Sequence, residues 1–84
     1  MREGALVYVK WVDPSSTAKW LEKDEAKGRT PMHCETVGFF LNRDRDVIRI
    51  CCSRSEEGRV ADVFVIPRGC VKEIRELEFK EGKV

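Results

Sequence analysis

The stretch that decides the fold runs from residue 33 to residue 53 and has the sequence HCETVGFFLNRDRDVIRICCS. Its two apolar runs, 33–42 and 47–53, are rich in the β-branched and aromatic residues that favour strands. The polar run between them, 42–46, is typical of a turn. Gly38 interrupts the first run, and a glycine inside a strand often marks a bulge or a sharp bend. The stretch therefore predicts two strands joined by a turn, with the first strand bent.

Three further apolar runs predict strands on either side of this pair. They cover residues 5–12, 60–66 and 71–77. In the last run Val71, Ile74 and Leu77 recur at every third position, which also suits a helix, so periodicity leaves strand and helix open there. The charged residues that follow, 78–84, are expected to fray.

One helical insertion is predicted after the first strand, at about residues 14–27. Asp13 and Pro14 suit the N-cap and the first helical position, and Gly28 suits the stop. The apolar stripe of this segment is narrow, and a short helix persists only when it docks onto something. We therefore expect Trp20 to pin the helix to the rest of the fold.

These elements predict a mainly β protein with one short helix, forming a single domain over residues 1–84. Five short strands make a weak flat sheet at this size, whereas closure into a barrel removes the exposed edges. A bent strand lets one strand serve both halves of such a barrel. The pattern therefore predicts a small five-stranded barrel with one helical insertion.

The composition and charge of the chain exclude some classes of function. The 84 residues carry 16 Lys plus Arg against 15 Asp plus Glu, a formal net charge of +1. The charges also balance locally, which excludes a basic arm that would coat nucleic acid nonspecifically. No apolar run approaches the ~18 residues of a membrane span or suits a signal-peptide core. A cytoplasmic protein with free thiols and no membrane contact is expected.

The sequence contains no catalytic constellation, and an enzyme is not expected. His33 stands beside Cys34, and adjacent residues on a strand point to opposite faces, so the two cannot form a nucleophile–base pair. His33 and the cysteines supply enough donor atoms for zinc, but the chain has no C-x-x-C pair, and buried or half-buried thiols are favoured over a metal site. The cysteines are Cys34, Cys51, Cys52 and Cys70. No cofactor motif is present.

The use of arginine rather than lysine in the middle of the chain is the most informative feature of the sequence. The stretch from Gly28 to Val71 carries seven arginines and no lysine. Arginine grips phosphate or carboxylate with two parallel hydrogen bonds and stacks on rings. Arg43 and Arg45 fall in the first polar turn, and Arg68 falls in the turn before the last strand. Two interpretations stay open: the turns bind an anion, or their arginines pair with neighbouring carboxylates on the surface.

Trp11 also has two interpretations. Val7, Val9 and Trp11 share one face of the first strand, and we expect Trp11 to be the more exposed of the two tryptophans. An exposed Trp11 would stack on a base, as aromatic side chains do in proteins that bind single strands. The alternative is packing in the core.

Two segments resemble the motifs of the Sm-like small barrels, the family that includes bacterial Hfq. The first is Gly38-Phe39-Phe40-Leu41 with the following turn that contains Asp44 and Asp46, and the second is Ile66-Pro67-Arg68-Gly69-Cys70-Val71. The early strand followed by a helix is closer to an SH3-like barrel with a long first connection. The pattern V-W-D early in the chain, T-V-G in the middle and I-P-R-G-C near the end also resembles small uncharacterised bacteriophage proteins.

The resemblance implies a ligand-binding site and a biological role. In Sm-like proteins the corresponding turns converge at a pore and hold RNA bases and phosphates. The candidate ligand-binding residues are then Asn42, Arg43, Asp44, Arg45, Arg68 and Gly69, with Trp11 added for stacking. A phage origin implies interference with host regulation or defence, for example by sequestering a nucleotide signal. A homo-oligomer is expected as well, because so short a chain buries a modest core.

Two functions follow for a non-enzymatic protein. In the first, the chain is a binding module that grips a nucleotide, a short RNA or a similar anion through its arginine-bearing turns. In the alternative, it is a protein–protein interaction or structural subunit, for instance against a host protein, because edge strands of small barrels pair readily with a neighbour. Binding that weakens with salt would favour the first function.

Overall fold

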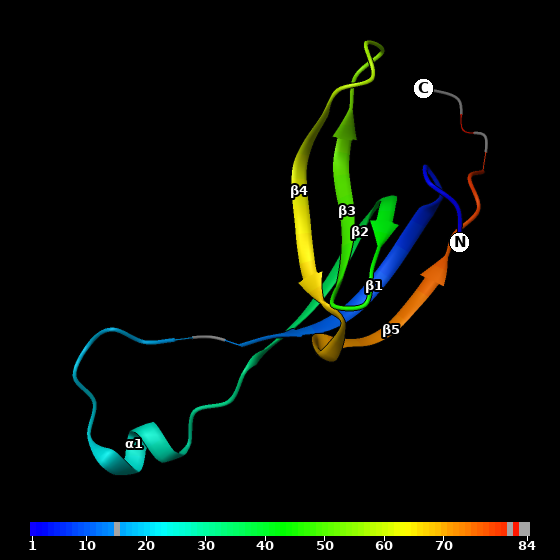
Figure 1. The fold of residues 1–84 in the computed structure, drawn as a ribbon. Helices are drawn as coiled ribbons and strands as arrows, with labels where there is room; N and C mark the ends of the chain where they lie inside the picture. The colour runs from blue at the N-terminus through cyan, green and yellow to red at the C-terminus, as the bar shows by residue number, and fades with distance from the viewer. Residues whose placement is uncertain (15, 81, 83–84) are drawn as a thin grey trace.

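The structure is a computed structural model that describes residues 1–14, 16–80 and 82, and this part of the chain forms five strands, one α-helix and one 3₁₀ helix (Figure 1). The strands are β1 (Leu6–Asp13), β2 (Met32–Arg43), β3 (Val47–Arg54), β4 (Val60–Pro67) and β5 (Val71–Glu76). The helices are α1 (Lys23–Lys27) and η1 (Arg68–Cys70). The prediction of a mainly β protein with one short helix is confirmed, and the open choice for the last run resolves to a strand.

The strands form one antiparallel sheet in the order β4-β3-β2-β1-β5. The predicted closure into a barrel is wrong for this structure. Closure requires a ladder between β4 and β5, but the two strands leave η1 in different directions (Figure 1), and no such ladder occurs among the described residues. Both strands therefore keep a free edge.

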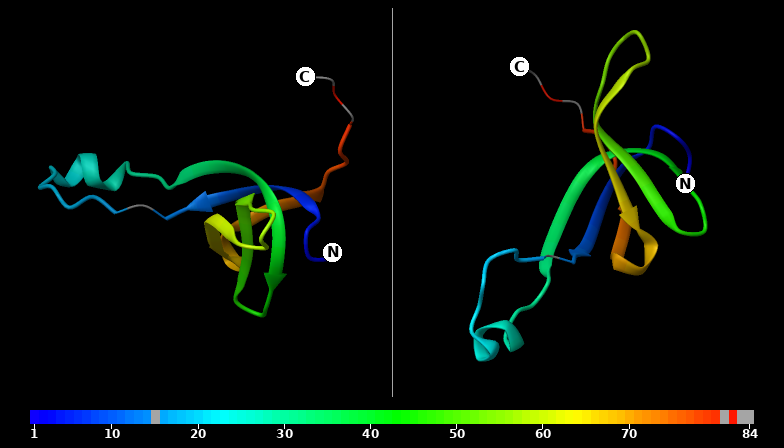
Figure 2. Two further views of the ribbon diagram at one scale, coloured as in Figure 1. Left: turned by 90° about the horizontal axis from the view of Figure 1, so that it is seen from above. Right: turned by 60° about the vertical axis from the view of Figure 1, so that its left-hand side comes forward.

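The long strand β2 serves both halves of the sheet and curves strongly along its length (Figure 2). It pairs with β1 from Met32 to Phe39 and with β3 from Phe39 to Arg43. The register shift in β2 falls between Phe40 and Asn42, beyond the predicted position at Gly38. Gly38 has a different role: a Cβ there would lie 2.7 Å from the carbonyl oxygen of Cys51, so only glycine permits this approach of the β3 backbone.

The core lies inside the curve of the sheet. Its buried side chains are Val7, Val9, Phe40, Ile48, Ile50 and Ile66. The partly buried side chains packed against them are Ala5, Trp11, Cys70, Val71 and Ile74. Alternation places Val7 and Val9 on one face of β1, and burial of each such side chain contributes about 1.5–3 kcal/mol. The small core holds the two halves of the curved sheet together.

The predicted helix over residues 14–27 is much shorter in the structure. Asp13 is still part of β1, where it pairs with Met32, so it cannot cap a helix. The helix α1 begins at Lys23 with Glu22 as its N-cap, and it stops at Gly28 as predicted. The Trp20 side chain is 100% exposed and pins nothing, so that prediction is wrong. Without a docked apolar face, most of the segment has nothing to stabilise a helix.

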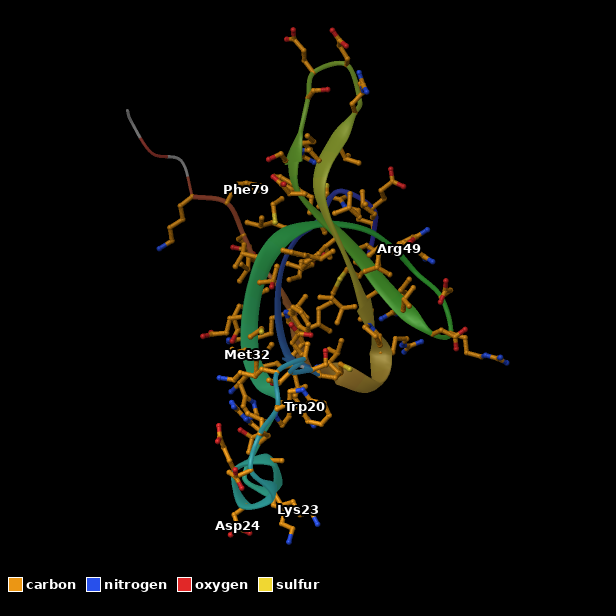
Figure 3. All side chains as sticks on the ribbon, turned by 90° about the vertical axis from the view of Figure 1, so that its left-hand side faces the viewer. Trp20, Lys23, Asp24, Met32, Arg49 and Phe79 are labelled. Atoms are coloured by element: carbon orange, nitrogen blue, oxygen red, sulfur yellow. The ribbon has the colours of Figure 1, made fainter. Side chains whose placement is uncertain are left out.

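Residues 14–31, of which residue 15 lies outside the described residues, form an arm that projects from the sheet with α1 at its far end (Figures 1 and 2). Figure 3 labels Lys23 and Asp24 on α1 and Trp20 on the segment before it, and the Trp20 side chain is fully exposed. The radius of gyration is 16.4 Å, whereas a compact chain of this length has about 12 Å. The arm is therefore a protrusion, and none of its described residues contributes a side chain to the core.

The charged tail lies partly outside the described residues, at 81 and 83–84, so the predicted fraying is described only up to Lys80 and at Gly82. In the described part, the Phe79 ring stacks on Phe39 with 6.4 Å between the ring centroids. The Arg54 guanidinium lies 3.8 Å from the centroid of the Phe39 ring. Within the described residues, no helix has the length and apolar character needed to cross a membrane.

Candidate functional site

The turn between β2 and β3 is organised by Asp44. Its Oδ1 accepts the backbone N–H of Asp46 at 2.8 Å and that of Val47 at 3.0 Å. The Asp44 backbone N–H donates to the carbonyl oxygen of Val47 at 3.0 Å. An aspartate that accepts backbone N–H groups ahead of it in this way fixes a turn. The run of charged residues after Asn42 therefore adopts one defined conformation.

Arg49, on β3, occupies the second oxygen of the same carboxylate. Its Nη1 donates to Asp44 Oδ2 at 3.0 Å and to Asn42 Oδ1 at 3.1 Å. The backbone N–H groups of Asp46 and Val47, and then Arg49, lower the pKa of Asp44 below its ordinary value. Asp44 is therefore a carboxylate whose two oxygens already have partners.

The second predicted turn is joined directly to the first. The backbone N–H of Arg68 donates to the carbonyl oxygen of Asp46 at 2.9 Å, and Arg68 Nη1 donates to that of Asp44 at 3.2 Å. Two segments more than twenty residues apart in the sequence thus meet at one end of the sheet. Of the predicted residues, Asn42, Asp44 and Arg68 belong to this hydrogen-bonded cluster.

Arg43 and Arg45 flank the cluster without joining it. The side chain of Arg45 is 94% exposed, and its Nε lies 3.9 Å from Asp46 Oδ1. Arg43 is exposed and makes no side-chain hydrogen bond or ion pair with a described residue. The neighbouring Gly69 faces open space, with no atom within 4 Å of the position of a Cβ. Arg43 therefore keeps its donors available at this surface, and Arg45 is engaged only by the long contact of its Nε with Asp46.

The charges of this region do not cancel. The cations are Arg43, Arg45, Arg49 and Arg68, and the anions are Asp44 and Asp46. Four positive charges against two leave a local excess of two in a chain whose total is +1. We call this set, together with Asn42, the arginine end of the sheet. It is an open surface with fixed polar groups, and it suits an anion better than an apolar ligand.

The remaining arginines of the lysine-free stretch have separate roles. Arg29 forms an ion pair with Glu25 at 3.2 Å on the arm, and Arg54 stacks on Phe39. Arg49 forms the surface pair with Asp44 that the second interpretation expected for these side chains. Surface pairing thus accounts for Arg29 and Arg49 and, at the longer distance of 3.9 Å from Asp46, for Arg45. It leaves Arg43 without a pair among the described residues.

Trp11 is half-buried and packs against the core, so the expectation that it is the more exposed tryptophan is wrong. Its Nε1 donates to Thr36 Oγ1 at 2.9 Å, which satisfies the indole N–H. Its backbone pairs with Val71, next to η1. Trp11 therefore contributes to the core beside the arginine end rather than to the hydrogen-bonded cluster itself.

The cysteines are free thiols, and Cys51 is buried whereas Cys52 is exposed. The thiol of Cys52 lies 3.6 Å from the carbonyl oxygen of Val37, and that of Cys34 lies 3.8 Å from the carbonyl oxygen of Met32. In the described part of the chain, no three His, Cys, Asp or Glu side chains gather closely enough to hold a metal ion.

Arg49 is the residue of this site that the sequence did not single out. It is directly opposite Asn42 across the β2–β3 pair. The signal was present in the alternation of β3, because Ile48 and Ile50 face the core and Arg49 between them must face outward. Pairing across the predicted turn then brings that outward position close to Asp44.

Comparison with known proteins gives no relative: no family model, no curated protein and no solved structure matches this chain.

Proposed function

We propose that this protein is a non-enzymatic binding module that holds a phosphate-bearing ligand, a nucleotide or a short RNA, at the arginine end of the sheet. One observation carries the proposal. The two predicted turns are tied together through Asp44 and Arg68, while beside them Arg43 has no side-chain partner among the described residues and Arg45 has only a 3.9 Å contact with Asp46. Folding thus assembles a local positive excess from a chain that is almost neutral.

The chemistry of the cluster supports phosphate as the group that is bound. An unpaired carboxylate would repel an anion, but both oxygens of Asp44 are engaged by backbone N–H groups and by Arg49. Asp44 therefore acts as the organiser of the turn. Arg43 and Arg45 each offer a planar fork that matches two phosphate oxygens. Because the surface is open, we expect modest affinity that weakens with salt.

The test is binding of a short fluorescein-labelled single-stranded RNA, and of a nucleotide in competition, followed by fluorescence anisotropy over a range of salt. We expect the double variant Arg43→Ala/Arg45→Ala to bind at least about tenfold more weakly, since hydrogen bonds to charged groups contribute about 1.5–3 kcal/mol each. Its salt dependence should also be shallower by about one unit of slope per lost phosphate contact.

Arg59→Ala is the matched control, because it removes one exposed arginine at the opposite end of β3 and β4. It should bind as the unaltered protein does. A loss of binding free energy in the control of about half that in the double variant, or more, would contradict the proposal, because Arg59→Ala removes one charge where the double variant removes two, and binding would then follow total charge. Absence of binding by the unaltered protein would contradict it as well.

We also infer that the sheet is an opened form of a small SH3-like or Sm-like barrel. Two features support this: β2 bends to serve both halves of the sheet, and Arg68-Gly69-Cys70 forms the short connection between the last two strands. The motifs shared with Sm-like proteins and with small phage proteins support interference with host regulation or defence as the role. Sequestration of a nucleotide signal would use the arginine end directly.

The alternative function is protein–protein interaction, and the arm supports it. Trp20 is fully exposed there, and Met32 at the base of the arm is exposed too. Tryptophan is among the residues that contribute most to binding at protein interfaces, so a fully exposed Trp20 on a protrusion suits a contact with another molecule. This function predicts a host protein that is retained at high salt by the unaltered chain and by Arg43→Ala/Arg45→Ala, and lost by Trp20→Ala. Retention by Trp20→Ala would contradict it.

A further inference from the structure

Strand β4 is apolar on both of its faces and yet stands at the edge of the sheet. Phe64 lies opposite Ile50 and so faces the core side, where it is still 38% exposed. Val63 and Val65 face the other side and are 46% and 56% exposed. Within β4, Ile66 is the buried side chain. The strand therefore leaves apolar surface uncovered on both sides of an open backbone edge.

This composition is that of an interior strand. Strands covered on both faces are nearly continuous apolar runs, whereas edge strands carry lysines, other charges or proline that prevent pairing with another chain. The run from Val60 to Ile66 has one charge, Asp62, which has a φ of 55° and lies in the gap of the β3–β4 ladder between the Cys51–Val63 and Ser53–Ala61 pairs. The edge at Val63, Phe64 and Val65 has no such protection.

The opposite edge of the sheet is protected in the usual way. Strand β5 carries exposed charges at four of its positions, namely Lys72, Glu73, Arg75 and Glu76. Its two remaining side chains, Val71 and Ile74, pack against the core. A partner for β4 must bring an apolar strand with a free edge, and β5 lacks that character. Among the described strands of this chain, β4 alone has it, so β4 of a second copy is the matching surface.

We propose that β4 pairs antiparallel with β4 of a second copy across a two-fold axis, so that one sheet continues through both copies. Two-fold dimers are the commonest assemblies because one patch serves both partners. If the two Phe64 residues lie opposite each other, Val63 lies opposite the second copy's Val65, and the two Asp62 carboxylates do not face each other. Such apolar cross-strand pairs stabilise a sheet. The dimer does not depend on the arginine end.

The experiment measures the mass of the purified full chain by light scattering at several concentrations, with circular dichroism as the check on folding. We expect a dimer that does not grow further. Val65→Lys should weaken it by about a hundredfold or more, since it places an unpaired charge in the new ladder. Val37→Lys is the matched control, because Val37 is also 50% exposed but lies on the interior strand β2. It should remain a dimer.

Hydrogen exchange supplies a second readout that does not depend on the variant. In the dimer, the outward amides of Val63 to Val65 should be protected as in an interior strand, and in folded Val65→Lys they should exchange freely. A monomer at every concentration, an assembly larger than two copies, or free exchange along β4 in the unaltered protein would overturn the proposal. If Val65→Lys does not fold, the unaltered protein's mass and exchange still decide it.

Discussion

At the scale of single residues, Gly38 is the glycine at which an added side chain would meet the closest neighbouring atom. A methyl group there would meet the backbone carbonyl of Cys51 at 2.7 Å, and backbone cannot move aside as a flexible side chain does. We expect Gly38→Ala to lower the free energy of unfolding by about 1–3 kcal/mol, the usual cost of overpacking. Urea unfolding measures it. Gly69→Ala is the control and should be close to neutral, because its Cβ would face open space.

Asp44, also a single residue, makes the stability of the folded protein depend on pH. Its pKa in the folded protein is lowered from 3.8 by the backbone N–H groups of Asp46 and Val47 and by Arg49. A lowered pKa means that the folded protein favours the charged form of Asp44. The carboxylate therefore stabilises the folded state above pH 3.8, and this stabilisation is lost as the pH falls through the lower pKa of Asp44 in the folded protein. We expect the carbonyl carbon of the Asp44 carboxyl to titrate below the ordinary range in an NMR titration.

The variant Asp44→Asn tests the effect of the Asp44 charge separately from the role of Asp44 in the turn. Asparagine retains an oxygen that accepts the two backbone N–H groups, so the turn should persist, but the ion pair with Arg49 is removed. We expect the variant to lose, relative to the unaltered protein, the part of the acid sensitivity that falls below pH 3.8. An unchanged acid limb in Asp44→Asn would show that other carboxylates are responsible.

At the scale of elements, the β-hairpin formed by β2 and β3 was the most predictable part of the fold. Alternation and a polar turn are local signals, and they decide which residues face inward. The prediction of a helix over residues 14–27 was largely wrong, because a cap and a stop residue define only the ends of a helix. Its persistence depends on an apolar face that packs against something, and Trp20 finds nothing to pack on.

The candidate site likewise has a part that could be predicted from local sequence and a part that could not. The turns could be predicted because asparagine, aspartate and glycine indicate them locally. The contact of Arg68 with Asp44 could not, because it depends on how β3 and β4 pair and on where η1 then directs the chain. Closure of the barrel depends on the β4 and β5 edges meeting, which is a property of the whole sheet and leaves no trace in any short stretch.

At the scale of the whole molecule, we expect the arm to contribute little to the stability of the sheet, because none of its described side chains packs in the core. Asp13 and Met32, at the two ends of the arm, are already paired in the β1–β2 ladder. Residues 14–31 can therefore be replaced by a two-residue Asn-Gly turn, which suits a hairpin. Shortening a loop this much removes about three doublings of length, and each doubling costs about 0.6 kcal/mol of closure entropy. We expect the shortened protein to be as stable as the full chain or up to about 2 kcal/mol more stable.

Small-angle scattering and urea unfolding test this together, in Val65→Lys so that pairing of β4 does not add to the apparent size. The radius of gyration should fall from near 16.4 Å towards the ~12 Å or less of a compact chain, and the unfolding midpoint should not fall. A large loss of stability would show that the arm packs on the sheet in solution. Retention of RNA binding by the shortened protein would separate the arginine end from the arm, whereas loss of that binding would assign the arm a part in holding the ligand.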